Sequence, residues 1–181
     1  MQASALNPAN LLTVLRFCMV PMVIVAIVNT QWSLAFVLFV TAGVTDAVDG
    51  FVARHFNMRT ELGAYLDPLA DKALLVSIYV TLAVSGAIPS WIAVLVVSRD
   101  VMIVGAVIVS WLMSNPVEIN PLKLSKANTL AQISFAALIL STLAFPWVSE
   151  QVITAGMGIV TVLTITSMMA YLATWFRHMS D

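Results

Sequence analysis

The chain has 181 residues, of which 61% are hydrophobic, and its eight Lys and Arg side chains and nine Asp and Glu side chains leave a formal net charge of −1 at pH 7. This composition is too apolar for a soluble domain, so we expect an integral membrane protein. The near-zero net charge does not itself indicate a partner, and we expect no nucleic-acid partner.

Six apolar segments follow one another along the chain, each near the length of about 20 residues that a helix needs to cross a bilayer. They cover residues 11–29, 33–54, 64–86, 91–113, 125–145 and 152–175. Together they use nearly the whole chain and leave no room for a soluble domain. We therefore predict an all-α bundle of six transmembrane helices, forming a single domain over residues 1–181.

The basic residues near the connections are distributed unevenly. They lie at the N-terminus, in the second or fourth connection, or at the C-terminus, and the first, third and fifth connections have none. Because cytoplasmic loops carry the excess of Lys and Arg, both termini are expected in the cytoplasm. The start of the chain shows neither a cleaved signal nor a transit peptide, so we expect a bacterial inner membrane.

The first segment begins with polar residues at regular spacing. Asn10, Thr13 and Arg16 are three residues apart, so they roughly share a helix face that could direct a cation into the bundle. The alternative is that Arg16 extends to the lipid head groups. Cys18, the single cysteine, lies in this segment and is expected to be a small packing residue.

The second segment ends with two acidic residues beside small ones. Asp46, Asp49, Gly50 and Ala53 fall at steps of 0, 3, 4 and 7, which places them on one helix face. An ionised carboxylate near the centre of a bilayer costs about 2.5–3.5 kcal/mol, so these residues require a compensating ligand.

The third segment begins with a matching stripe, because Gly63, Asp67 and Asp71 repeat at steps of four. If the two helices fold back on each other, four carboxylates meet, and hard cations such as Mg²⁺ or Mn²⁺ suit their oxygens. Two such ions could also bind a pyrophosphate. No His or Cys stands at these positions, which argues against zinc. Structural ion pairs with Arg54 and Lys72, or a cation site in a transporter, are the alternatives.

These residues resemble the complete signature of the CDP-alcohol phosphotransferase family, D-x-x-D-G-x-x-A-R-x8-G-x3-D-x3-D. The signature positions are Asp46, Asp49, Gly50, Ala53, Arg54, Gly63, Asp67 and Asp71. The resemblance implies an enzyme in which an alcohol attacks the phosphorus attached to diacylglycerol in CDP-diacylglycerol and CMP leaves. It also implies a homodimer. The distribution of Lys and Arg, by the positive-inside rule, places the acidic site on the cytoplasmic side together with both termini.

The resemblance assigns roles to the signature residues. It implies that Asp46, Asp49, Asp67 and Asp71 are metal ligands and that Asp71 is also the general base toward the acceptor hydroxyl. The cytidine diphosphate would contact Asp46, Asp49, Gly50, Ala53, Arg54 and Gly63. The opening N-x-x-T-x-x-R pattern of Asn10, Thr13 and Arg16 resembles the family as well, and implies contacts to the head group.

Polar residues also interrupt the fourth and fifth segments. Arg99 and Asp100 form an adjacent opposite-charge pair inside an apolar run, which is costly unless it lines a polar cavity. At the start of the fifth segment, Ser125, Thr129 and Gln132 fall near one face, with Lys126 beside them. Structural pairing is one interpretation; the other, which we favour, is that Arg99, Asp100 and Lys126 bind an anionic lipid acceptor.

The acceptor alcohol is indicated by the segments VSRDVMI and SKANTLAQ, which resemble the cardiolipin synthases of this family. In those enzymes phosphatidylglycerol is the acceptor, and cardiolipin and CMP are the products. The sibling phosphatidylglycerophosphate synthase takes glycerol 3-phosphate and often has Glu in place of Asp100. A chain with only eight Lys and Arg mildly favours the lipid acceptor.

Two other classes of membrane protein use acidic residues. A membrane prenyltransferase would need a larger bundle and usually a second acidic motif, whereas after Asp71 the spans offer only Asp100. A divalent-cation transporter would be supported by inverted repeats, and we find none. Ala106 and Ser110 form one small-x-x-x-small step that could bring helices together, in a dimer for example.

Overall fold

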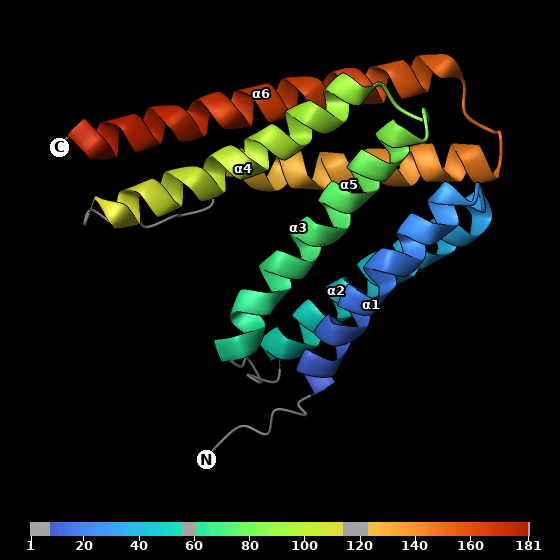
Figure 1. Ribbon diagram of the computed structural model, residues 1–181, viewed down its shortest axis with the longest axis horizontal. Helices are drawn as coiled ribbons and strands as arrows, with labels where there is room; N and C mark the ends of the chain where they lie inside the picture. Colours follow the sequence, from blue (N-terminus) through green and yellow to red (C-terminus); the bar gives the residue numbers. More distant parts are fainter. Residues whose placement is uncertain (1–7, 56–60, 114–122, 181) are drawn as a thin grey trace.

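The computed structural model describes residues 8–55, 61–113 and 123–180, and these form six helices (Figure 1). The helices are α1 (Pro8–Val28), α2 (Trp32–His55), α3 (Glu61–Val84), α4 (Ser90–Leu112), α5 (Lys123–Ala144) and α6 (Glu150–Ser180). No strand occurs in these ranges. The prediction of an all-α fold is confirmed, and the helices correspond one to one to the six apolar segments.

Three of the helices are long and apolar enough to cross a membrane. They span Ser90–Leu112, Leu124–Ala144 and Glu150–Arg177. In the first three helices the parts with described side chains are shorter apolar stretches, Cys18–Val28, Trp32–Thr45 and Lys72–Val84. The chain is therefore a membrane protein by length and composition, and six crossings remain a prediction.

The outward faces of the helices agree with a lipid environment. Large apolar side chains are exposed along α4 and α6, including Val94, Val101, Ile108, Val152, Ile159 and Val162. Exposed hydroxyls donate to carbonyls one turn back in their own helix: Thr41 Oγ1 to Val37 O at 2.7 Å and Thr166 Oγ1 to Val162 O at 2.7 Å. These bonds satisfy the hydroxyls where no water is available.

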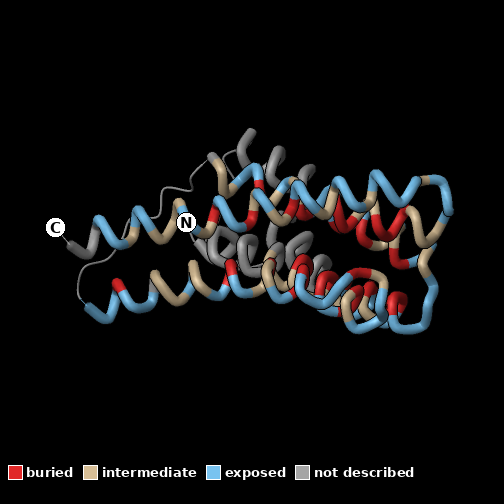
Figure 2. Tube along the Cα trace, turned by 90° about the horizontal axis from the view of Figure 1, so that it is seen from above, coloured by how far each residue is buried: buried red, intermediate tan, exposed pale blue. Residues whose placement is uncertain are grey.

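The helices form two groups that diverge toward one end of the molecule (Figure 1). Helix α1 packs on α2 and α3, while α6 packs on α4 and α5. The α2–α5 and α3–α4 contacts join the groups. Buried residues gather toward the end that holds the α1–α2, α3–α4 and α5–α6 connections (Figure 2). The core includes Val23, Ile27, Ile78, Tyr79, Ile92, Val96 and Leu140. The helices are thus anchored to each other at the end opposite the acidic stretch.

Two glycines have a specific role in the fold, one in a turn and one at a helix contact. Gly86 has φ +76° in the α3–α4 connection, where the Ala87 N–H donates to Leu82 O at 2.9 Å, and this left-handed conformation favours glycine. Gly156 lies where α6 crosses α5. A Cβ added there would lie 2.9 Å from Cδ2 of Phe135, whose ring is buried. The absence of a side chain at Gly156 therefore permits the α5–α6 packing.

Candidate functional site

The signature residues lie at the adjoining ends of two helices. Asp46, Asp49, Gly50, Ala53 and Arg54 are in the last part of α2, and Gly63, Asp67 and Asp71 are in the first part of α3. The predicted helical setting of both acidic stripes is thereby confirmed. Their side chains lie outside those that the structure describes, as do those of Asn10, Thr13 and Arg16 in α1. The roles of these eleven residues stay predictions.

The donor atoms of the predicted metal ligands indicate which metals they suit. Among the described side chains, no group of three or more His, Cys, Asp and Glu could hold a metal ion. The four signature aspartates supply only carboxylate oxygens, and this donor set fits Mg²⁺ or Mn²⁺ better than zinc. The assignment of the signature aspartates as metal ligands stays a prediction.

Arg99 and Asp100, in contrast, are fully described, and both are buried in the middle of α4, at 2% and 6% exposed. Arg99 Nη1 donates to Asp100 Oδ1 at 2.6 Å. The adjacent opposite charges therefore pair with each other. This agrees with the first of the two sequence interpretations, structural pairing. A buried ion pair contributes little net stability unless its remaining donors are satisfied as well.

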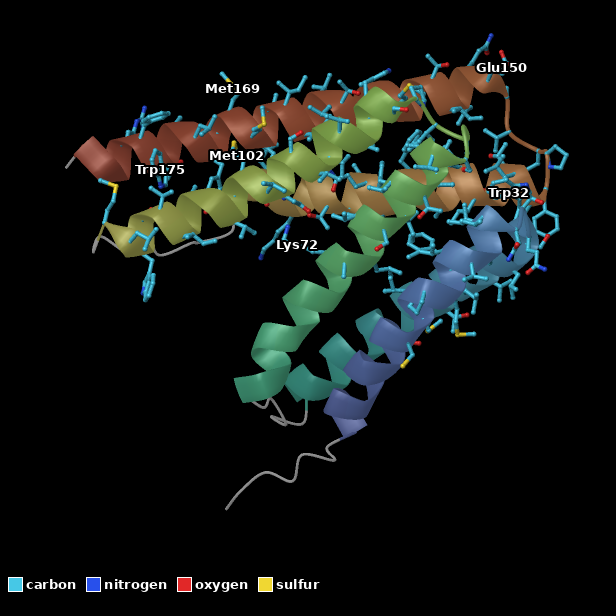
Figure 3. The ribbon with its side chains drawn as sticks, in the orientation of Figure 1. Trp32, Lys72, Met102, Glu150, Met169 and Trp175 are labelled. Carbon is cyan, nitrogen blue, oxygen red and sulfur yellow. The ribbon has the colours of Figure 1, made fainter. Side chains whose placement is uncertain are left out.

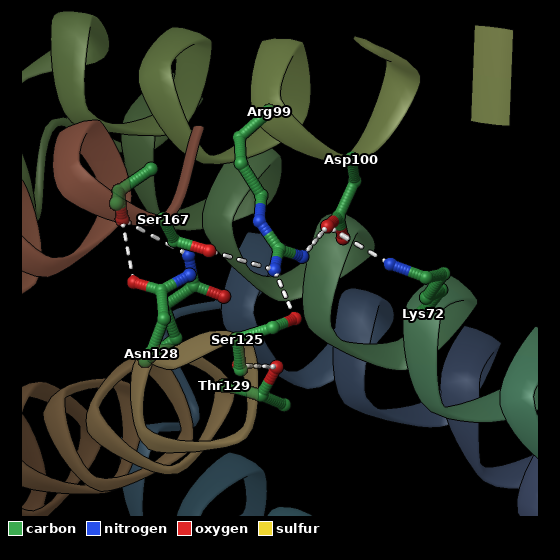
Figure 4. Close-up of polar contacts among 9 residues, drawn as sticks. Lys72, Arg99, Asp100, Ser125, Asn128, Thr129 and Ser167 are labelled. Atoms are coloured by element: carbon green, nitrogen blue, oxygen red, sulfur yellow. Dashed lines mark hydrogen bonds and ion pairs between the residues drawn. The ribbon is translucent and has the colours of Figure 1, made fainter. Parts of the chain in front are cut away.

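The other terminal nitrogen of Arg99 reaches two further helices (Figure 4). Nη2 donates to Ser125 Oγ of α5 and to Ser167 Oγ of α6, the latter at 3.1 Å. The guanidinium thus joins α4, α5 and α6 at one point. Arg99 Nε is buried and has no hydrogen-bond partner among the described residues. A buried N–H without an acceptor is costly.

Lys72 of α3 completes this group, and it directly follows Asp71 of the signature. Its Nζ lies 2.9 Å from Asp100 Oδ1, the same oxygen that accepts from Arg99. The Lys72 side chain is 41% exposed, whereas that of Asp100 is 9% exposed. Figures 3 and 4 show Lys72 reaching from α3 toward α4. We call Lys72, Arg99 and Asp100 the cation cluster; its two positive charges and one negative charge give a net charge of +1.

From the sequence, Lys72 is expected only as a partner in a structural ion pair with the signature acids. The structure gives it a partner that sequence spacing does not indicate, because Asp100 lies on another helix. The signal that could have singled out Lys72 is its position, since it is a cation inside an apolar run and next to the last signature aspartate.

A second polar group lies deeper between α3, α5 and α6. Gln132 Nε2 donates to Thr164 Oγ1 at 3.2 Å, and this hydroxyl donates to Asn128 Oδ1 at 2.9 Å. Tyr79 OH donates to Gln132 O at 3.0 Å. Asn128 Nδ2 is buried with no partner among the described residues. Asn128 was not among the predicted site residues, although it is three residues after Ser125 and four before Gln132.

The remaining predicted polar residues have separate surroundings. Thr129 Oγ1 donates back to Ser125 O at 3.2 Å, within α5. Lys126 is exposed, and no described residue forms an ion pair with it. The structure therefore brings together Arg99, Asp100 and Ser125 but leaves Lys126 outside this hydrogen-bonded group.

The small-x-x-x-small step of α4 has a partner within the chain. Trp175 of α6 points toward α4 (Figure 3), and its Nε1 donates to Ser110 Oγ at 2.7 Å and to Ala106 O at 3.1 Å. This face of α4 therefore packs against α6. Its small residues do not require a second copy of the chain.

Comparison with known proteins supports the family that the signature motif indicates. The model of the CDP-alcohol phosphatidyltransferase family matches residues 6–176. A probable phosphatidylglycerophosphate synthase of Mycobacterium tuberculosis is 39% identical over 105 residues, which cover 55% of this chain and 50% of that protein. The human cardiolipin synthase (CMP-forming) is 33% identical over 152 residues, covering 75% and 50% of the two chains.

A putative cardiolipin synthase of Mycobacterium bovis is 30% identical over 113 residues, which cover 61% of this chain and 53% of that protein. The chain spans about half the length of these curated relatives. Relatives of both synthase types therefore match, and the family match extends over nearly the whole sequence. The resemblance read from the signature is confirmed: the chain belongs to the CDP-alcohol phosphatidyltransferase family.

Proposed function

We propose that this protein is a cardiolipin synthase, which transfers the phosphatidyl group of CDP-diacylglycerol to phosphatidylglycerol and releases CMP. The observation that carries the proposal is the position of the cation cluster. Lys72 directly follows Asp71 of the signature, and it pairs with the buried Asp100 of α4, which also accepts from Arg99. A binding site for an anionic acceptor would therefore adjoin the residue proposed to activate the acceptor hydroxyl.

The proposed reaction is an in-line displacement at phosphorus. The hydroxyl oxygen of the acceptor forms a bond to the phosphorus that carries diacylglycerol. The bond from this phosphorus to the bridging oxygen of the pyrophosphate breaks, and CMP leaves with the electron pair. Asp71 accepts the hydroxyl proton as the general base. Positioning of the two lipids provides most of the remaining rate enhancement.

The signature residues would hold the nucleotide end of the donor. Asp46, Asp49, Asp67 and Asp71 would bind Mg²⁺ or Mn²⁺, with two ions expected. Such ions neutralise charge on a pyrophosphate and its leaving group. The small residues Gly50, Ala53 and Gly63 would permit close approach of the cytidine diphosphate, and Arg54 would pair with its phosphates.

The acceptor would bind through its phosphate. Arg99 supplies a planar guanidinium with unused donor capacity, and Asp100 orients it. Lys126 at the start of α5 is exposed and available for a head group. Asn10, Thr13 and Arg16 of α1 are proposed to contribute to head-group binding.

The membrane arrangement is proposed from the charges at the connections. Six crossings with both termini in the cytoplasm would place the α2–α3 and α4–α5 connections, with the Arg and Lys residues in or beside them, on the cytoplasmic side. The active site would then face the cytoplasm, which suits a substrate that carries a nucleotide. We further propose a bacterial inner membrane, a single domain over residues 1–181 and a homodimer.

The second candidate is a phosphatidylglycerophosphate synthase, with glycerol 3-phosphate as acceptor. It is favoured by the 39% identity to the M. tuberculosis protein of that name, although over a shorter alignment than that of the human cardiolipin synthase. Family membership favours either enzyme over a transporter of divalent cations or a prenyltransferase.

The experiment that tests the proposal measures CMP release from CDP-diacylglycerol by purified protein with Mg²⁺ or Mn²⁺. Phosphatidylglycerol and glycerol 3-phosphate are compared as acceptors, and Asp71→Asn is the control. Release that depends on phosphatidylglycerol and is lost in the variant supports cardiolipin synthesis. Release with glycerol 3-phosphate alone assigns the second candidate. The absence of release with either acceptor contradicts both.

A further inference from the structure

We propose that Lys72 is a positioning residue: its ion pair with Asp100 holds the signature-bearing part of α3 at a fixed distance from Arg99 of α4. The signature gives Lys72 no role of its own. The consequence for catalysis rests on the proposed function, in which Asp71 of α3 is the general base and Arg99 binds the acceptor phosphate. The ion pair is a feature of the fold and does not depend on that proposal.

The two helices that Lys72 and Asp100 connect belong to different groups of the bundle. Helix α3 packs with α1, and α4 packs with α6, and the groups diverge toward the end that carries the signature (Figure 1). Among the described residues of α4, the last buried apolar side chain in that direction is Val96, one turn before Asp100. The ion pair therefore joins α3 to α4 beyond the part of α4 that the apolar core holds.

The α4 side of this contact is held firmly. Asp100 is 6% exposed, and its Oδ1 also accepts from Arg99 Nη1 at 2.6 Å. Arg99 is in turn bonded to Ser125 of α5 and Ser167 of α6. Because burial and these bonds restrict the carboxylate, Lys72 Nζ meets an acceptor oxygen in a defined position, at 2.9 Å (Figure 4).

The α3 side of the contact is continuous with the signature. Asp71 and Lys72 are successive residues of one helix, so the distance between their backbones is fixed. The same Oδ1 of Asp100 contacts Lys72 and Arg99, and this shared oxygen sets how far the α3 backbone lies from the guanidinium. In the proposed reaction, that separation must match the span between the attacking hydroxyl and the phosphate of the acceptor.

The ion pair is expected to affect the rate more than the stability. Lys72 is 41% exposed, and Asp100 keeps Arg99 as a partner when Lys72 is replaced, so Lys72→Met is expected to fold. Reacting atoms must approach to about 3–3.5 Å, and a displacement of about 1 Å can lower the rate about 100-fold. Loss of the ion pair should therefore lower kcat and leave the contacts of each substrate in place.

The first experiment measures the position of α3 relative to α4 without any substrate. Spin labels are attached to cysteines at Glu61, where α3 begins, and Leu112, where α4 ends, in a full chain whose single cysteine is replaced by serine. Lys72→Met should give a longer and broader distance distribution in pulsed electron paramagnetic resonance, and Lys72→Arg should give that of the wild type. Labels at the exposed Val84 and Glu150, at the opposite end, are the control and should not respond.

The second experiment measures CMP release with the acceptor that the wild-type protein uses. The rate is expressed per molecule of CDP-diacylglycerol bound, with binding measured in the absence of acceptor, so it does not depend on the fraction of folded protein. Lys72→Met should lower kcat at least about tenfold and leave the KM of each substrate within about twofold of wild type. Lys72→Arg can keep the ion pair and should recover most of the rate.

The outcomes separate this proposal from the proposed function. An unchanged distance distribution in Lys72→Met overturns the positioning role, whatever the activity. A changed distribution with an unchanged kcat per bound donor also overturns it, and so does a raised KM for the acceptor, which would show that Lys72 binds the acceptor directly. Wild-type protein that releases no CMP with phosphatidylglycerol overturns the proposed function instead, and the distance measurement still decides whether Lys72 holds α3 in place.

Discussion

Lys72 of α3 and Asp100 of α4 form an ion pair, with 2.9 Å between Nζ and Oδ1, and this contact lies one residue beyond the acidic signature. The helices that diverge toward the signature end are therefore tied to each other by charge as well as by the core at the opposite end. Arg99 extends the connection to Ser125 and Ser167, so α3, α4, α5 and α6 meet in one hydrogen-bonded group.

The bond between Arg99 and Ser167 is expected to stabilise the fold. Ser167→Ala removes a hydroxyl that accepts from a buried cation, so we expect a loss of about 1.5–3 kcal/mol in the free energy of unfolding. Ser98→Ala on α4 is the matched control, because the exposed Ser98 hydroxyl donates only to Val94 O of its own helix. Thermal unfolding in detergent measures the stability of both variants. Equal unfolding midpoints for the two variants would show that Arg99 does not depend on Ser167.

The close approach of α5 and α6 predicts a difference between two glycines of α6. Gly156→Ala would place a Cβ 2.9 Å from the buried Phe135 ring, and overpacking of this kind costs about 1–3 kcal/mol. Gly158→Ala meets nothing within 4 Å and should be neutral or stabilise the helix slightly. The comparison uses urea unfolding followed by circular dichroism. A Gly156→Ala variant as stable as Gly158→Ala would contradict the described packing.

Activity is expected to depend on a divalent cation held by the signature aspartates. Removal of metal by a chelator should abolish CMP release, and Mg²⁺ or Mn²⁺ should restore it, whereas Zn²⁺ should not. Asp67→Asn removes one proposed ligand and should raise the metal concentration needed for half-maximal rate by at least about tenfold. Full activity in the chelator would contradict the metal proposal, and so would an unchanged metal requirement in the variant.

The proposed topology predicts which connections each side of the membrane can reach. In a Cys18→Ser background, cysteines introduced at Gln31 and Ser149 should react with an impermeant maleimide in right-side-out vesicles. A cysteine at Arg59 should react only in inverted vesicles. Labelling of the Arg59 position and the Gln31 position from the same side would rule out six crossings.

The sequence predicted the helices well because continuous apolar runs define them. Helix α2 begins at Trp32 and α4 at Ser90, each one residue before the predicted segment. Helix α6 extends to Ser180, past the predicted end at 175. The predicted segment ends with the apolar residues, whereas the helix continues through the polar residues that follow. The boundaries differ where hydrophobicity and helix formation do not end together.

The site was predictable only where its residues form a linear pattern. The signature and the Arg99–Asp100 pair stand out as charges within apolar segments. The ion pair of Lys72 with Asp100 and the bond of Arg99 to Ser167 join different helices. Such contacts depend on how each helix is rotated and packed, which spacing along the chain does not specify. Asn128 was missed for the same reason, since its burial follows from the packing of α5.

The central claim, that phosphatidylglycerol is the acceptor, is tested most directly by following the atoms of the two lipids. Purified protein is given CDP-diacylglycerol and phosphatidylglycerol labelled with ¹³C in its free glycerol, and the lipid products are analysed by mass spectrometry. The account predicts cardiolipin that contains the labelled glycerol, formed in equal amount to CMP, and none with Asp71→Asn. Formation of phosphatidylglycerophosphate in parallel reactions with glycerol 3-phosphate, with no labelled cardiolipin, would contradict it.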